Sequence, residues 1–207
     1  MNGMVISNLL KLFSGFAVFF NLVGFTFSTM ENTRLEYDII KGNNKIGELN
    51  ATRNKLGEEV SYAIDSKVVI SFLFELNIQF KYDSKFENDY LTWSDFSNMT
   101  NNKEKESTEI TWEKYRYKVK TDKKESYVSK SQIAYTLSKM YFIEPIGIDK
   151  VFSERFAEYL TVSEIGDHMY ELTLPDGKKN IYSFENGICN EVKVDHTLAT
   201  FYFRLKQ

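Results

Sequence analysis

The sequence predicts a mainly β protein: one curved antiparallel meander sheet forming an open half-barrel, with one or two short helices packed on its concave face. Three observations support this fold class. Apolar and polar residues alternate over long stretches, aromatic residues make up 15% of the chain, and short turn motifs separate the alternating stretches. Aromatic and β-branched side chains suit a pleated surface, and one-sided alternation is typical of antiparallel sheet.

Length and composition favour a single folded unit. The chain has 207 residues, with 2 Pro, 10 Gly and no Pro/Gly-rich linker. We therefore expect residues 29–207 to form one β-rich domain. The net charge of −3 argues against a nucleic-acid partner, since such a partner requires a concentrated basic face.

The N-terminal residues have the pattern of a secretory signal peptide. Lys11 is the only charged residue before Glu31, and a mostly apolar run follows it over residues 12–27. We predict that residues 1–28 are removed after Ser28. The alternative is an uncleaved membrane anchor, but the run is shorter than the roughly 20 residues that cross a bilayer. The mature chain is thus expected to be exported, periplasmic or extracellular, without a transmembrane span.

The first strands are predicted at 35–41 and 45–53, around the turn Gly42-Asn43-Asn44. The strongest alternation covers 72–82, where every even position is apolar and most odd positions are polar. Residues 60–64 share this parity. One face of these strands is therefore expected to be buried and the other solvated.

Two features are predicted between residues 98 and 120. The polar stretch 98–107 is expected to be a long exposed hairpin loop. Ile110 and Trp112 have the opposite parity to Tyr117 and Val119, so we expect a β-bulge near Glu113 to absorb the shift.

The segment 131–143 departs from the strand pattern. Ile133, Leu137, Met140 and Tyr141 form a helical stripe. Ser129 or Ser131 can cap its start, and Pro145 stops it. The next stretch, 151–160, fits either a second short helix or a strand.

The C-terminal third returns to strands. Residues 170–174 alternate and precede the turn Pro175-Asp176-Gly177. Asn186-Gly187 is a strong hairpin signal that joins 181–185 to 188–194, and a last strand is expected at 201–205.

Several of these segments resemble a family of uncharacterised exported proteins of Gram-negative bacteria, distantly similar to LolA-like half-barrels of the envelope. The similar residues are Tyr37-Asp38-Ile39, Ile46-Gly47, the run Val151–Phe156 and the tail Tyr170–Leu198. The resemblance covers essentially the whole mature chain. It implies an unclosed β half-barrel with an apolar cavity for a lipid or acyl chain, and it transfers no catalytic residue.

Catalytic and metal-binding patterns are weak. Cys189 has no second cysteine to pair with, and Cys189 and His196 are too far apart on one strand to form a dyad. His196 is interpreted as a structural histidine and His168 as a solvated turn residue. No metal or cofactor signature is found. We therefore expect that the protein is not an enzyme and binds neither a metal nor a cofactor.

Ser153-Glu154-Arg155 is the most suggestive short motif. A serine nucleophile needs a nearby base, and the sequence offers none in register. We favour a structural account in which Ser153 caps a turn and Arg155 pairs with a carboxylate on the sheet.

Three functional hypotheses remain. In the first, the protein binds a lipid or another apolar ligand in the half-barrel, although the same side chains would equally form a dry core. The predicted lining residues are Phe72, Phe74, Leu76, Ile78, Phe80, Ile133 and Leu137. In the second, it is a structural or assembly factor of the cell envelope that contacts a protein through its sheet edges or the loop 98–107. In the third, it is a hydrolase whose site is not visible in the sequence.

Overall fold

The computed structural model describes residues 29–71, 75–196 and 199–206. The predicted signal peptide, residues 1–28, lies outside the described residues. Within them, the chain forms one antiparallel sheet and one short helix, α1 (Leu137–Met140). The strands are β1 (Met30–Lys41), β2 (Asn44–Leu56), β3 (Glu59–Ser71), β4 (Glu75–Glu87), β5 (Tyr90–Thr100), β6 (Lys103–Glu113), β7 (Arg116–Thr121), β8 (Glu125–Val128), β9 (Lys150–Ser153), β10 (Glu158–Gly166), β11 (Met169–Thr173), β12 (Lys179–Glu185), β13 (Ile188–His196) and β14 (Ala199–Leu205).

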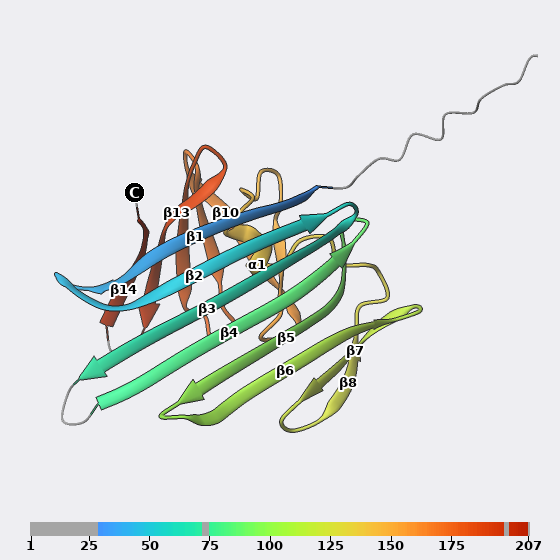
Figure 1. Cartoon of the computed structure of the whole chain (residues 1–207), viewed down its shortest axis with the longest axis horizontal. Coiled ribbons are helices and arrows are strands. Elements are labelled where there is room, and N and C mark those ends of the chain that lie inside the picture. Colours follow the sequence, from blue (N-terminus) through green and yellow to red (C-terminus); the bar gives the residue numbers. More distant parts are fainter. Residues whose placement is uncertain (1–28, 72–74, 197–198, 207) are drawn as a thin grey trace, which may run out of the picture.

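The sheet consists of two meanders. Strands β1 to β8 follow one another in space as in sequence, and so do β9 to β14. The meanders meet where β1 pairs with β14, so that β8 and β9 are the two ends of the sheet and it does not close into a barrel (Figure 1). The predicted fold class, an open antiparallel half-barrel with little helix, is confirmed.

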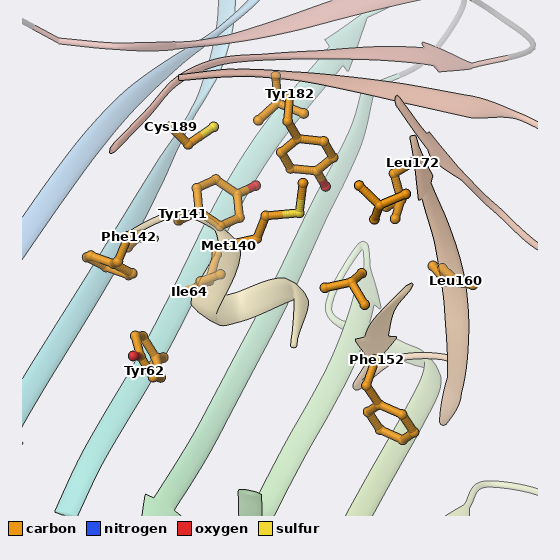
Figure 2. Packing of buried hydrophobic residues seen from close by; sticks show 14 of the residues in the cluster. Tyr62, Ile64, Met140, Tyr141, Phe142, Phe152, Leu160, Leu172, Tyr182 and Cys189 are labelled. Carbon is orange, nitrogen blue, oxygen red and sulfur yellow. The ribbon is translucent and has the colours of Figure 1, made fainter. Parts of the chain in front are cut away.

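Residues 129–149 connect the two ends of the sheet and are called the plug here. The plug contains α1, which packs against β3, β4 and β9. Its residues Met140, Tyr141 and Phe142 lie among side chains from both meanders (Figure 2). Tyr141 makes edge contacts with Tyr37 of β1 and Tyr182 of β12. The plug therefore supplies the apolar partner that an open sheet needs to bury one face.

The helix predicted over 131–143 is wrong except over the four residues of α1. Ser129 and Ser131 bond to each other instead of capping a helix, and Thr136 precedes α1 without a side-chain cap. The physical reason is competition for backbone groups: the carbonyl of Ile133 accepts from the amide of Leu91, and the carbonyl of Tyr135 accepts from Phe152. Bonds to the sheet thus replace the helical ladder in this segment.

The stretch 151–160 resolves into a hairpin. Strand β9 ends at Ser153, a tight turn follows, and β10 begins at Glu158 opposite Ser153. The strand alternative is therefore the correct one for this segment.

The long loop predicted over 98–107 is also wrong. Strands β5 and β6 continue through it and turn at Asn101-Asn102, both with positive φ. Two such residues are typical of a type I′ hairpin. The polar side chains that suggested a loop are compatible with strands, because one face of an antiparallel sheet can be exposed to water.

The bulge predicted near Glu113 is a turn instead. Glu113 of β6 pairs with Arg116 of β7, and Lys114 and Tyr115 form the connection between them. The change of parity between Trp112 and Tyr117 follows from this turn, since a new strand starts after it.

The strand predicted over 72–82 is confirmed from Glu75 onward. In β4 the even positions face the core, ending in Ser84 and Phe86, which are both buried. Residues 72–74, including the predicted site residues Phe72 and Phe74, lie outside the described part of the chain.

Gly47 shows where the sheet tolerates no side chain. It lies in β2 beside a register shift between Ile39 and Ile40 of β1. A Cβ added there would lie 2.2 Å from the carbonyl oxygen of Lys67 and 2.9 Å from the Cα of Val68. These are backbone atoms of β3, so the strand itself would have to move.

We therefore expect Gly47→Ala to lower the free energy of unfolding by about 1–3 kcal/mol, the usual cost of overpacking. Urea unfolding measures it. Gly166→Ala is the matched control, because its added Cβ meets nothing nearer than the sulfur of Met169 at 3.7 Å. Equal effects of the two substitutions would contradict the close approach of β2 and β3.

Candidate functional site

The inward face of the sheet changes from dry to partly exposed along its strands. In β4, Ser84 and Phe86 are buried beside the plug, whereas Leu76, Ile78 and Phe80 remain partly exposed to solvent. The uncovered side chains lie toward the end of the sheet that holds the β1–β2 turn. We call this the open end and its partly exposed inward wall the trough.

Strands from the C-terminal meander continue the trough. Val192 of β13 is buried, but Val194 further along the strand is only partly buried. Phe203 of β14 lies opposite both Val192 and Ile39, and it is also only partly buried. Apolar side chains from both meanders thus face the same incompletely covered interior.

A hollow of about 770 Å³ lies at the rim of the open end. It is formed by the β1–β2 turn, the end of β3 and the start of β14. Its lining residues are Lys41, Gly42, Asn44, Lys45, Ile46, Val69, Ile70, Ala199 and Thr200. Ile70 pairs with Leu76, so this hollow adjoins the wall that β4 contributes to the trough.

The five predicted lining residues that the structure describes fall into two groups, and Phe72 and Phe74 lie outside the described residues. Leu76, Ile78 and Phe80 lie on the trough wall. Ile133 is fully buried in the plug, and Leu137 of α1 packs on the core. The structure therefore brings the β4 residues together but places Ile133 and Leu137 in the covered part of the half-barrel.

The turn after β9 ties the two meanders together. The hydroxyl of Ser153 accepts a hydrogen bond from the amide of Phe156 at 3.3 Å. Arg155 pairs with Glu106 of β6, with Nη2 2.7 Å from Oε2 and Nε within 3.2 Å of both oxygens. The predicted turn contact of Ser153 and the predicted ion pair of Arg155 with a sheet carboxylate are thus confirmed.

Glu154, between them, is the main residue that the sequence analysis missed. Its side chain is 0% exposed. Its Oε1 accepts hydrogen bonds from the amide and the hydroxyl of Ser138, at the start of α1. Ser138 in turn contacts the hydroxyls of Ser84 and Thr136. A buried polar cluster therefore joins the turn, the plug and β4.

This cluster leaves one oxygen of the carboxyl unpaired, because Glu154 Oε2 is buried and has no hydrogen-bond partner within the described part of the chain. Burial raises the pKa of Glu154 above its ordinary value of 4.5, and bonds from Ser138 and Thr136 only partly oppose that shift. A charged carboxylate is costly in such a place. One feature of the sequence could have indicated this burial: Glu154 lies in a short segment between two aromatic residues, Phe152 and Phe156.

His168 lies outside this cluster. His168 lies in the β10–β11 turn with φ of 54°, as predicted for a turn residue. Its Nδ1 lies 2.8 Å from Glu144 Oε1 in the plug, and this bond raises the pKa of His168. The hydroxyl of Tyr170 donates to the same oxygen. His168 therefore helps to hold the plug, a role that its sequence position did not reveal.

Cys189 and His196 stand at opposite ends of β13, which agrees with the exclusion of a dyad. Cys189 is fully buried, and burial raises the pKa of its thiol far above the ordinary value. A thiol in this state is a small apolar core residue rather than a nucleophile.

The described residues hold no group of three or more His, Cys, Asp or Glu side chains that could bind a metal ion. Among the same residues, no helix has the length and apolar character needed to cross a membrane.

The buried carboxyl predicts a pH dependence of stability. Because the folded pKa of Glu154 is raised, its stabilising contribution is complete below about pH 4.5 and is lost as the pH rises through the folded pKa. We expect the difference in unfolding free energy between wild type and Glu154→Gln to move in favour of the variant as the pH increases.

Urea unfolding between pH 4 and 8 tests this expectation, and a difference that stays constant with pH would contradict it. Asp176→Asn serves as a control without pH dependence in this range. Hydrogen bonds from Lys178 lower the pKa of Asp176, so its contribution is fully present above pH 3.8 and is lost only at lower pH.

The fold and the family of the chain can be compared with those of known proteins. Among solved structures, the chain is similar to the "Beta-barrel-like Protein of Domain of Unknown Function DUF1849 from Brucella abortus", with a TM-score of 0.52 and 12% sequence identity. The match covers 88% of this chain and 98% of that chain, and at this identity it shows the fold alone.

No curated protein matches the sequence. A family model, described as "Domain of unknown function (DUF6134)", matches residues 37–206. The chain therefore belongs to the DUF6134 family.

Proposed function

We propose that this protein is an exported binding protein that holds a lipid or another apolar ligand in the trough. The observation that carries the proposal is the incomplete cover of the inward face. The plug buries one end of the half-barrel, and an apolar wall including Leu76, Ile78 and Phe80 stays partly exposed at the other.

A ligand lying on this wall would gain free energy by removing apolar surface from water. The gain is about 25 cal/mol per Å² of apolar surface covered. The hollow of about 770 Å³ at the rim falls within the usual size of sites for small molecules. Because the wall consists of strands paired within one sheet, the site is largely preformed, which reduces the entropic cost of binding.

Export is part of this proposal. It rests on the N-terminal pattern of Lys11 followed by the apolar run 12–27. The resemblance to LolA-like half-barrels supports the same compartment and an acyl-chain ligand. A periplasmic or extracellular location would bring the trough close to lipids of the envelope.

The two other hypotheses receive less support. An assembly factor acting through the loop 98–107 loses that contact surface, since β5 and β6 form a tight hairpin there, although the short edge strand β8 remains available. A hydrolase using Ser153 is disfavoured because this residue is fully buried and its hydroxyl accepts a hydrogen bond from the amide of Phe156.

The first test is to purify residues 29–207 and extract the protein with organic solvent for mass spectrometry. We expect a co-purifying lipid, and we expect binding of the neutral fluorescent probe N-phenyl-1-naphthylamine. Failure to detect either, with protein that is folded by circular dichroism, would remove the proposal.

The location of the ligand is tested by Ile78→Gln. Placing an amide on the apolar wall should weaken binding of the probe by about ten-fold, since burial of such a side chain is worth about 1.5–3 kcal/mol. Lys81→Gln is the control, because Lys81 lies on the same strand but is exposed on the outer face. Equal weakening by both substitutions would place the ligand elsewhere.

A further inference from the structure

We infer that the ligand carries an anionic head group with paired oxygens, a carboxylate or a phosphate, and that Arg155 binds it on the wall of the trough. This inference rests on the proposed function and adds the chemical class of the ligand. It follows from the surroundings of Arg155, which combine a forked cation, aromatic rings and an unpaired polar atom.

The backbone fixes Arg155 at the boundary between the plug and the trough. Its carbonyl accepts a hydrogen bond from the hydroxyl of Thr108 at 2.9 Å, so the turn is held against β6. Glu106 shares its strand face with Thr108 and Ile110, which are both buried, and therefore points inward. The ion pair of Arg155 and Glu106 thus lies inside the half-barrel rather than on its outer surface.

Aromatic rings surround the guanidinium. Its Cζ lies 4.8 Å from the ring centroid of Phe156, 5.5 Å from that of Phe96 and 5.9 Å from that of Phe80. Phe80 also belongs to the trough wall. A cation at the edge of an apolar wall matches an amphiphile, whose head and tail require these two environments side by side.

The ion pair is open to exchange. The side chains of Arg155 and Glu106 are 32% and 30% exposed, so solvent reaches both. Pairs that remain in contact with water contribute little net free energy. The planar guanidinium binds carboxylate or phosphate with two parallel hydrogen bonds. An anionic head group can therefore replace the carboxylate of Glu106 at small cost.

Asn98 supplies a second polar contact in the same place. It lies opposite Phe80 on one side and Glu106 on the other. Its Oδ1 is buried and has no hydrogen-bond partner among the described residues. A buried acceptor without a donor is unfavourable. The remaining P–OH of a singly ionised phosphate would donate to it, whereas a carboxylate would not.

The test measures displacement of N-phenyl-1-naphthylamine from the full mature chain by three ligands with the same tail: decanoate, decyl phosphate and decanol. Wild type is expected to prefer at least one of the two anions over decanol by about ten-fold. The two anions separate a carboxylate site from a phosphate site.

Three variants distinguish binding of the anionic head group by Arg155 from a role in which Arg155 only attaches the turn to β6. Arg155→Met should abolish the preference for the anion while decanol still binds, and Arg155→Lys should restore part of it, since it keeps the charge but loses the fork. Glu106→Gln should strengthen anion binding several-fold, because it removes the competing carboxylate. Thermal unfolding of each variant checks that it is folded.

A purely structural ion pair predicts the opposite pattern. Glu106→Gln would then leave anion binding unchanged or weaken it, and the Arg155 variants would affect decanol and the anions alike. Either result overturns the inference while leaving an apolar site in place. If none of the three ligands displaces the probe from wild type, the proposed function fails together with the inference.

Discussion

An open β-sheet with an apolar concave face must cover that face, and in this protein the plug covers it at one end only. A closed barrel removes its edges by pairing them. Here β8 and β9 remain as ends, and residues 129–149 pass between them across the interior. Met140, Tyr141 and Phe142 bury the deep part of both meanders. The trough exists because the plug is too short to reach the other end.

The attachment of the plug is polar as well as apolar. Glu154 bonds to Ser138 at the start of α1, and Glu144 bonds to His168 and Tyr170 in the C-terminal meander. Such buried contacts cost free energy to form and more to break, so they fix one arrangement of the plug rather than add much stability. The turn 153–156 extends this arrangement to β6 through Arg155. The same turn therefore holds the plug and presents a cation to the trough.

The sequence predicts the sheet well because two-residue alternation depends on each strand alone. The inward parity of Leu76, Ile78 and Phe80 could be predicted in this way. The extended form of residues 131–135 could not, because it depends on backbone bonds to Leu91 and Phe152, which are distant in sequence. Glu154 was missed for the same reason, since Ser138 and Ser84 approach it only in the fold. Which part of the inward face stays uncovered is likewise set by the position of the plug.

The most direct test of the account is a titration of the isotope-labelled protein with N-phenyl-1-naphthylamine, followed by amide and methyl NMR signals. The account predicts that signals of Leu76, Ile78, Val68 and Phe203 shift, while those of Leu91, Ile133 and Met140 in the covered end do not. Shifts confined to the plug or to the outer face of the sheet would contradict a trough that is open at one end.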